Sequence, residues 1–159
     1  MSFPAPEAFG ELATNISEIL FTEEQIQQRV LEIGATISRD YGGGRPLLVG
    51  VLKGVFPFMA DLMRSITIPA EVDFMAIASY SPEARRRGVV RLQKDIEQPI
   101  DGRHVLFVED VVDTGLTLHY ILDQLKSRNP ASLHVCTMFD KPSRRLIRLP
   151  IRYKGFDLP

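Results

Sequence analysis

The segment from Val105 to Thr117 constrains the fold of this chain more than any other stretch. Its apolar start, residues 105–108, shows no polar alternation, which is typical of a buried parallel strand. Beyond its end, apolar residues recur at helical spacing, at positions 118, 121, 122 and 125. A strand, a short turn and a helix in this order predict an α/β unit. Its turn would lie at the carboxyl end of a strand, the edge where open α/β sheets bind ligands.

The turn carries the residue types of a binding site. Two carboxylates, Glu109 and Asp110, are followed by a Thr- and Gly-containing turn, which consists of Asp113, Thr114, Gly115, Leu116 and Thr117. Three carboxylates at one strand end are costly unless a cation or a hydroxyl-rich ligand binds there. Free amides of such a turn and of the following helix form an anion site. Together they predict a sugar phosphate ligand, with carboxylates on the ribose hydroxyls and a Mg²⁺ ion, and amides on the phosphate.

Elsewhere, predicted strands alternate with predicted helices. Thr22 is the expected N-cap of a helix that ends at three glycines, residues 42–44, which we interpret as a helix stop and not as a phosphate loop. The other predicted elements are strands at 46–52, 71–79, 89–93, 133–139 and 151–156, and helices at 55–63 and from the turn to about 128. This alternation predicts a single α/β domain, residues 1–159, with a mostly parallel sheet flanked by helices. Residues 1–20, with two prolines, are expected to form a loose arm.

Composition excludes several classes of protein. The net charge of −1 gives no general attraction to nucleic acid or acidic membranes. No apolar run reaches membrane-spanning length, because Lys53 interrupts the best one. The start of the chain lacks the pattern of a secretory signal, and Cys136 is the only cysteine. We therefore expect a cytoplasmic protein that binds neither membranes nor nucleic acid.

The ordered pattern from Glu109 to Thr117 closely resembles the ribose-phosphate signature of the type I phosphoribosyltransferases, in the form of the hypoxanthine-guanine branch. The resemblance extends from about Glu23 to Pro159. It implies the fold of that family, with a small hood formed by the chain ends. It also implies Mg²⁺-dependent transfer of a 5-phosphoribosyl group from phosphoribosyl pyrophosphate to hypoxanthine, guanine or xanthine. Members are commonly dimers or tetramers, so a homodimer or homotetramer is expected.

The resemblance assigns roles within the signature. Glu109 and Asp110 would hold the ribose hydroxyls, directly or through the metal. Residues 113–117 would hold the 5′-phosphate through amides and hydroxyls. Asp113 would be the general base that accepts a proton from the purine as its other ring nitrogen attacks the sugar.

Three further segments resemble parts of the family's site. Lys53 and Gly54 follow a strand and match its pyrophosphate loop, in which the peptide bond before the lysine is cis. Ser79 and Tyr80 match the start of a lid that closes over the reacting centre. The arginines after them, residues 85–87, depart from the lid pattern and are equally well explained as a solvated face.

The last of these three segments runs from Phe139 to Arg145. By spacing, Lys141 would bind the 6-oxo group of the purine and Arg145 would contact pyrophosphate. Arg144 would replace Arg145 if the turn differed by one residue.

Two alternatives stay open. A regulatory homologue that binds RNA would need a basic face, to which residues 85–87 and 141–145 would contribute. The family's pattern also continues beyond Pro159 with residues that stack on the purine, contact its 2-position and help to bind metal. Because this sequence stops there, we expect a complete sugar-phosphate half and a purine half that lacks a wall, which makes a catalytically impaired member the second alternative.

Overall fold

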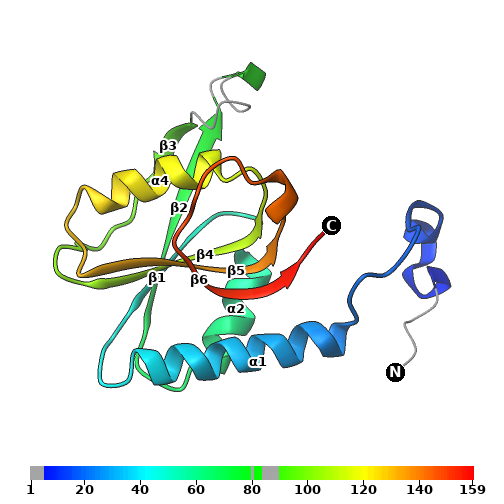
Figure 1. The fold of residues 1–159 in the computed structure, drawn as a ribbon, viewed down its shortest axis with the longest axis horizontal. Helices are drawn as coiled ribbons and strands as arrows, with labels where there is room; N and C mark the ends of the chain where they lie inside the picture. Colours follow the sequence, from blue (N-terminus) through cyan, green and yellow to red (C-terminus); the bar gives the residue numbers. More distant parts are fainter. Residues whose placement is uncertain (1–5, 80, 84–89) are drawn as a thin grey trace.

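The structure, a computed structural model, describes residues 6–79, 81–83 and 90–159 (Figure 1). Its sheet has six strands in the order β3-β2-β1-β4-β5-β6. The strands are β1 (Leu47–Val51), β2 (Glu71–Ser79), β3 (Val90–Lys94), β4 (His104–Val112), β5 (Ser132–Asp140) and β6 (Ile151–Asp157). All neighbouring pairs are parallel except β2 and β3. The predicted α/β fold with a mostly parallel sheet is confirmed.

Helices cover both faces of this sheet (Figure 1). The α-helices are α1 (Glu23–Asp40), α2 (Phe56–Ser65) and α4 (Leu116–Lys126), and two 3₁₀ segments are η1 (Pro6–Asn15) and η2 (Pro142–Arg144). Helices α1 and α2 pack on one face, in a core cluster that includes Leu106 and Cys136. Helix α4 packs on the other face, in a cluster that includes Val105 and Phe107. The successive residues 105–108 are fully buried because they alternate between two covered faces.

Local sequence signals set the start of α1. The Thr22 hydroxyl accepts a hydrogen bond from the Gln25 amide at 3.2 Å, and the Gln25 side chain accepts one from the Thr22 amide at 2.8 Å. This reciprocal pair is a capping box, which satisfies two otherwise unpaired donors at the helix start.

The segment just before α1 packs against strands β5 and β6 beside the sheet. The Phe21 ring stacks on Phe156 with centroids 4.2 Å apart and contacts Phe139 at 5.7 Å. Before Phe21, the η1 segment lies apart from the sheet (Figure 1). Helix α1 therefore starts close to the carboxyl ends of β5 and β6.

No helix within residues 6–79, 81–83 and 90–159 combines the length and apolar character that crossing a membrane requires.

Candidate active site

The carboxyl ends of the central parallel strands surround a cavity of about 390 Å³. It lies between the loop after β1 and the turn that joins β4 to α4. Its lining includes most of the predicted signature and part of the β1 loop: Val51, Leu52, Gly54, Ile77, Glu109, Val111, Val112, Asp113, Thr114, Gly115, Thr117, Leu118 and Ile121. The structure therefore brings together residues that are more than fifty positions apart in the sequence, as the resemblance implied.

Strand β4 is longer than predicted. It continues past the two carboxylates to Val112, because Val111 and Val112 still pair with Phe139 and Asp140 of β5. Glu109 and Asp110 therefore lie inside strand β4 and not beyond its end.

Burial and the adjacent Asp110 carboxylate raise the pKa of Glu109 well above its ordinary value. One Asp110 oxygen accepts a hydrogen bond from the Val111 amide at 2.8 Å. Two neighbouring carboxylates with an unfavourable mutual charge are oxygen ligands of the kind that Mg²⁺ prefers. No group of three or more His, Cys, Asp or Glu side chains among the described residues forms a complete metal site. The pair fits an ion that takes few protein ligands and completes its shell with substrate and water.

The turn before α4 depends on Gly115. This residue has φ 86°, in the left-handed region that favours glycine. A Cβ atom there would lie 3.0 Å from Leu149 Cδ1 and 3.1 Å from Arg145 Cδ. Gly115 precedes the first turn of α4, whose amides lack partners within the helix. The predicted anion site thus has the geometry of a helix N-terminus entered through a tight turn.

Asp113 lies in this turn with its side chain about half exposed, and its Oδ1 forms an ion pair with Arg144 Nε at 2.9 Å. The candidate general base is therefore held by a basic side chain in this structure. Arg144 was predicted only as a substitute for Arg145, and its contact with Asp113 was not predicted.

The loop after β1 places Lys53 and Gly54 at the same rim. The peptide bond between Leu52 and Lys53 is cis, as the resemblance implied. A Cβ atom at Gly54 would lie 3.0 Å from Asp110 Oδ2. Lys53 is exposed and pairs with no carboxylate in the part of the chain that the structure describes. Its ammonium group is available to an anion.

The segment after β5 lies against the signature turn. The Lys141 amide donates to the Val112 carbonyl at 2.9 Å, which places Lys141 at this edge of the sheet. Arg145 is mostly buried, pairs with the Asp140 carboxylate and donates from Nε to the Asp113 carbonyl at 3.1 Å. Several of its donors thus contact the protein itself. Sequence reasoning missed Asp140, whose signal was an acidic residue at the end of an apolar strand.

Part of the predicted lid is outside the described residues. Ser79 ends β2, where its backbone pairs with Val90. Tyr80 and the three arginines 85–87 fall in the stretches that the structure does not describe.

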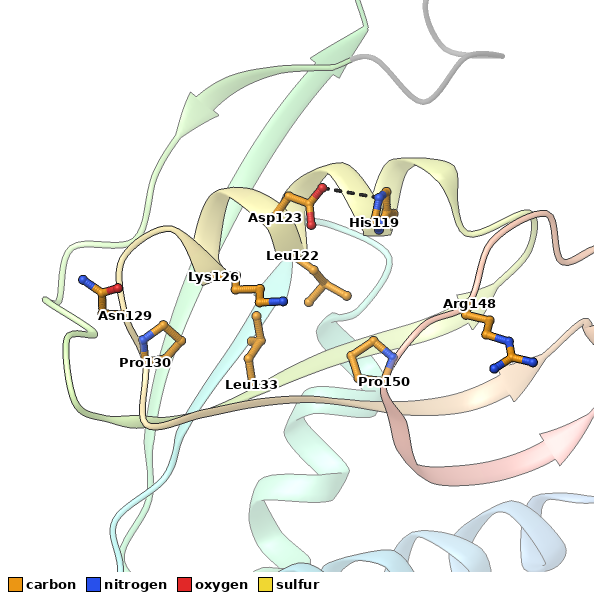
Figure 2. A pocket seen from close by; sticks show the side chains of 9 residues that line it. All are labelled: His119, Leu122, Asp123, Lys126, Asn129, Pro130, Leu133, Arg148 and Pro150. Atoms are coloured by element: carbon orange, nitrogen blue, oxygen red, sulfur yellow. Dashed lines mark ion pairs between the residues drawn. The ribbon is translucent and has the colours of Figure 1, made fainter.

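A second, larger hollow of about 630 Å³ lies on the other flank of α4 (Figure 2). Figure 2 shows side chains of α4, including the ion pair of His119 and Asp123 at 3.3 Å, together with Leu133, Arg148 and Pro150. None of the residues that line it is a predicted site residue. The predicted chemistry therefore converges on the smaller cavity.

Comparison with known proteins agrees with this geometry. A family model described as a phosphoribosyl transferase domain matches residues 17–157. A hypoxanthine-guanine phosphoribosyltransferase of Streptococcus agalactiae is 44% identical over 148 residues, which cover 93% of this chain and 82% of that protein. One from Dictyostelium discoideum is 44% identical over 146 residues, covering 89% and 81%.

Solved structures are similar too. A crystal structure of a hypoxanthine-guanine phosphoribosyltransferase from Bacillus anthracis has a TM-score of 0.86 and 42% identity, and the match covers 91% of this chain and 85% of that one. A hypoxanthine phosphoribosyltransferase from Staphylococcus aureus has a TM-score of 0.88 and 38% identity, covering 94% and 82%.

Proposed function

The chain belongs to the phosphoribosyltransferase family, and we propose that it transfers the 5-phosphoribosyl group of phosphoribosyl pyrophosphate to hypoxanthine or guanine. The products are IMP or GMP and pyrophosphate, a reaction of purine salvage. The observation that carries this proposal is that one cavity is lined by Glu109, the turn at Gly115 and Gly54 of the loop after β1. Asp110 lies beside that loop, 3.0 Å from where a Cβ atom of residue 54 would be. The enzymatic names of the relatives favour this function over an RNA-binding one.

The sugar phosphate is held at both ends. Glu109 and Asp110 bind the ribose hydroxyls and, with the substrate, a Mg²⁺ ion. The amides and hydroxyls of Asp113, Thr114, Gly115, Leu116 and Thr117 bind the 5′-phosphate, since the N-terminus of α4 favours negative charge. Glu109 and Asp110 would hold a Mg²⁺ ion, which would supply positive charge beside the leaving pyrophosphate.

Bond formation joins a purine ring nitrogen to C1′ of the ribose while the bond from C1′ to pyrophosphate breaks. Asp113 accepts the proton from the other nitrogen of the purine imidazole ring. Because Arg144 pairs with Asp113 at 2.9 Å in this structure, that ion pair must open or shift before the carboxylate can contact the base.

Pyrophosphate is bound by Lys53, Gly54 and Arg145. Lys53 contributes an exposed positive charge. Arg145 contributes through those guanidinium N–H groups that contact neither Asp140 nor the Asp113 carbonyl. Arg144, whose side chain is more exposed, is the alternative cation at this position.

Lys141 recognises the purine by donating a hydrogen bond to its 6-oxo group. Ser79 and Tyr80 form the start of a lid that excludes water from the reacting centre.

We further propose a cytoplasmic homodimer or homotetramer.

The test is a spectrophotometric assay of hypoxanthine, guanine and xanthine with phosphoribosyl pyrophosphate and Mg²⁺. Conversion of at least one 6-oxopurine, with equimolar release of pyrophosphate, is the expected result. A folded protein that binds phosphoribosyl pyrophosphate but converts none of the three would contradict the proposed activity.

A further inference from the structure

Three consecutive carbonyls of the signature turn accept hydrogen bonds from the segment after β5. The Lys141 amide donates to Val112 at 2.9 Å, Arg145 Nε to Asp113 at 3.1 Å, and the Leu146 amide to Thr114 at 3.0 Å. In a trans peptide, the carbonyl and the next N–H point in opposite directions. These bonds therefore turn the N–H groups of the next residues away from the segment. Residues 113–115 also line the cavity.

Arg145 is the side chain that makes the middle contact. Its side chain is only 16% exposed, so its position is fixed by the protein. Its Cδ occupies the space beside Gly115, where a Cβ atom would lie 3.1 Å away. Arg145 thus holds the Asp113 carbonyl and also packs on the turn that leads into α4.

Asp140 holds Arg145 in turn. It is the last residue of β5, is 6% exposed and pairs with the Arg145 guanidinium. Its other oxygen lies 3.7 Å from Lys154 Nζ. A buried carboxylate is tolerated when it is paired and hydrogen-bonded, and breaking such a pair leaves a costly charge behind. Asp140 does not line the cavity, and its two carboxylate oxygens face Arg145 and Lys154. Its effect on a ligand in the cavity would therefore pass through those side chains.

We infer that Asp140 is a positioning residue for the 5′-phosphate site. By fixing Arg145, it keeps the carbonyl of Asp113 and the turn at Gly115 in the conformation that presents main-chain amides to a phosphate. This inference rests on the proposed function only in taking a phosphorylated ribose as the ligand.

The test compares Asp140→Asn with Asp157→Asn. Asp157 is a matched control because it pairs with Asp140 in the register of β5 and β6 and forms an ion pair with the same lysine, Lys154, at 2.7 Å. The probe is ribose 5-phosphate, titrated calorimetrically. Asp140→Asn should weaken its binding about tenfold or more, as expected for loss of a charge-assisted hydrogen bond, whereas Asp157→Asn should stay within about twofold of wild type.

Kinetics give a second readout. Asp140→Asn should raise KM for phosphoribosyl pyrophosphate while KM for hypoxanthine at saturating sugar phosphate stays within about twofold, whereas general loosening of the fold would affect both. Equal effects on both constants, or unchanged ribose 5-phosphate binding, would overturn the inference.

A double-mutant cycle tests the route of the effect. In an Arg145→Met background, Asp140→Asn should weaken ribose 5-phosphate binding no further, because the residue through which it acts is gone. If the two substitutions weaken ribose 5-phosphate binding by factors that multiply, the proposed route is contradicted. If Asp140→Asn does not fold, Arg145→Lys replaces it, since lysine keeps the charge but lacks a second donor branch. Undiminished binding by folded Arg145→Lys would overturn the inference.

The two proposals fail differently. Wild-type protein that binds no ribose 5-phosphate contradicts the proposed phosphate site itself. Asp140→Asn protein that binds ribose 5-phosphate as well as wild type does contradicts only the role of Asp140.

Discussion

Gly54 and Asp110 are so close that a Cβ atom at position 54 would lie 3.0 Å from Asp110 Oδ2. The loop after β1 and the carboxylate pair near the end of β4 therefore occupy adjoining places on one rim. Under the proposed function, the pyrophosphate and the ribose of one substrate would contact these two adjoining places.

Gly54→Ala tests this contact. The added methyl group would lie closer to the Asp110 carboxylate oxygen than ordinary van der Waals contact, so Asp110 must move. We expect a higher Mg²⁺ concentration for half-maximal turnover and a raised KM for phosphoribosyl pyrophosphate, with a thermal midpoint close to that of wild type. A Mg²⁺ requirement identical to wild type would show that Asp110 can stay in place or does not serve the metal.

Asp113→Asn tests the general base. The amide keeps the size of the side chain but cannot accept the purine proton, so turnover should fall about 10²- to 10⁴-fold. Calorimetric binding of phosphoribosyl pyrophosphate should change little. Asp123→Asn, on the other flank of α4 and paired with His119, is the matched control and should keep full turnover. Unchanged turnover in Asp113→Asn would remove Asp113 from this role.

Glu109 should make the ligand-free protein less stable as pH rises. Burial and Asp110 raise its folded pKa above the unfolded value, so the folded protein binds more protons between the two values. The resulting stabilisation is complete below the unfolded pKa and is lost as pH rises through the folded pKa. Urea unfolding of wild type and Glu109→Gln, measured across this range without Mg²⁺, should show the wild type losing stability relative to the variant. A constant difference, or one of opposite sign, would be inconsistent with the raised pKa.

Gly115→Ala should cost stability and phosphate binding together. A left-handed conformation costs a residue with a Cβ about 1–2 kcal/mol, and the methyl group also meets Leu149 and Arg145. Gly102→Ala is the control, because Gly102 has φ 70° but open space around its Cβ position. Both variants should lose unfolding free energy in urea titrations, and only Gly115→Ala should lose ribose 5-phosphate binding. Normal binding by Gly115→Ala would mean that this turn does not form the phosphate site.

Much of the fold follows from the sequence because its signals are local. The buried run at residues 105–108, the Thr22 cap and the helical spacing after Thr117 each depend on near neighbours in the chain, and each matches the structure. The end of β4 was predicted too early, because its last pairs depend on β5, a strand that begins only at Ser132. The sequence around Glu109 and Asp110 does not by itself indicate that the strand continues past them.

The candidate site divides in the same way. The signature turn and the Lys53 loop were expected at strand ends, where a parallel sheet brings them together. The contacts of Arg144 with Asp113 and of Arg145 with Asp140 could not be predicted, since they depend on how η2 folds back over the turn. The sequence of a basic cluster does not tell which of its side chains are buried and which are exposed, and only the fold shows this.

The shared ribose-phosphate site is tested most directly by calorimetric titration of phosphoribosyl pyrophosphate with Mg²⁺ into wild type, Asp113→Asn and the double variant Glu109→Gln/Asp110→Asn. We expect a single site per chain in wild type and Asp113→Asn, and binding weakened about 100-fold or more when both carboxylates are gone. Equal affinity in the double variant would contradict the claim that these carboxylates and the turn before α4 grip one phosphorylated ribose.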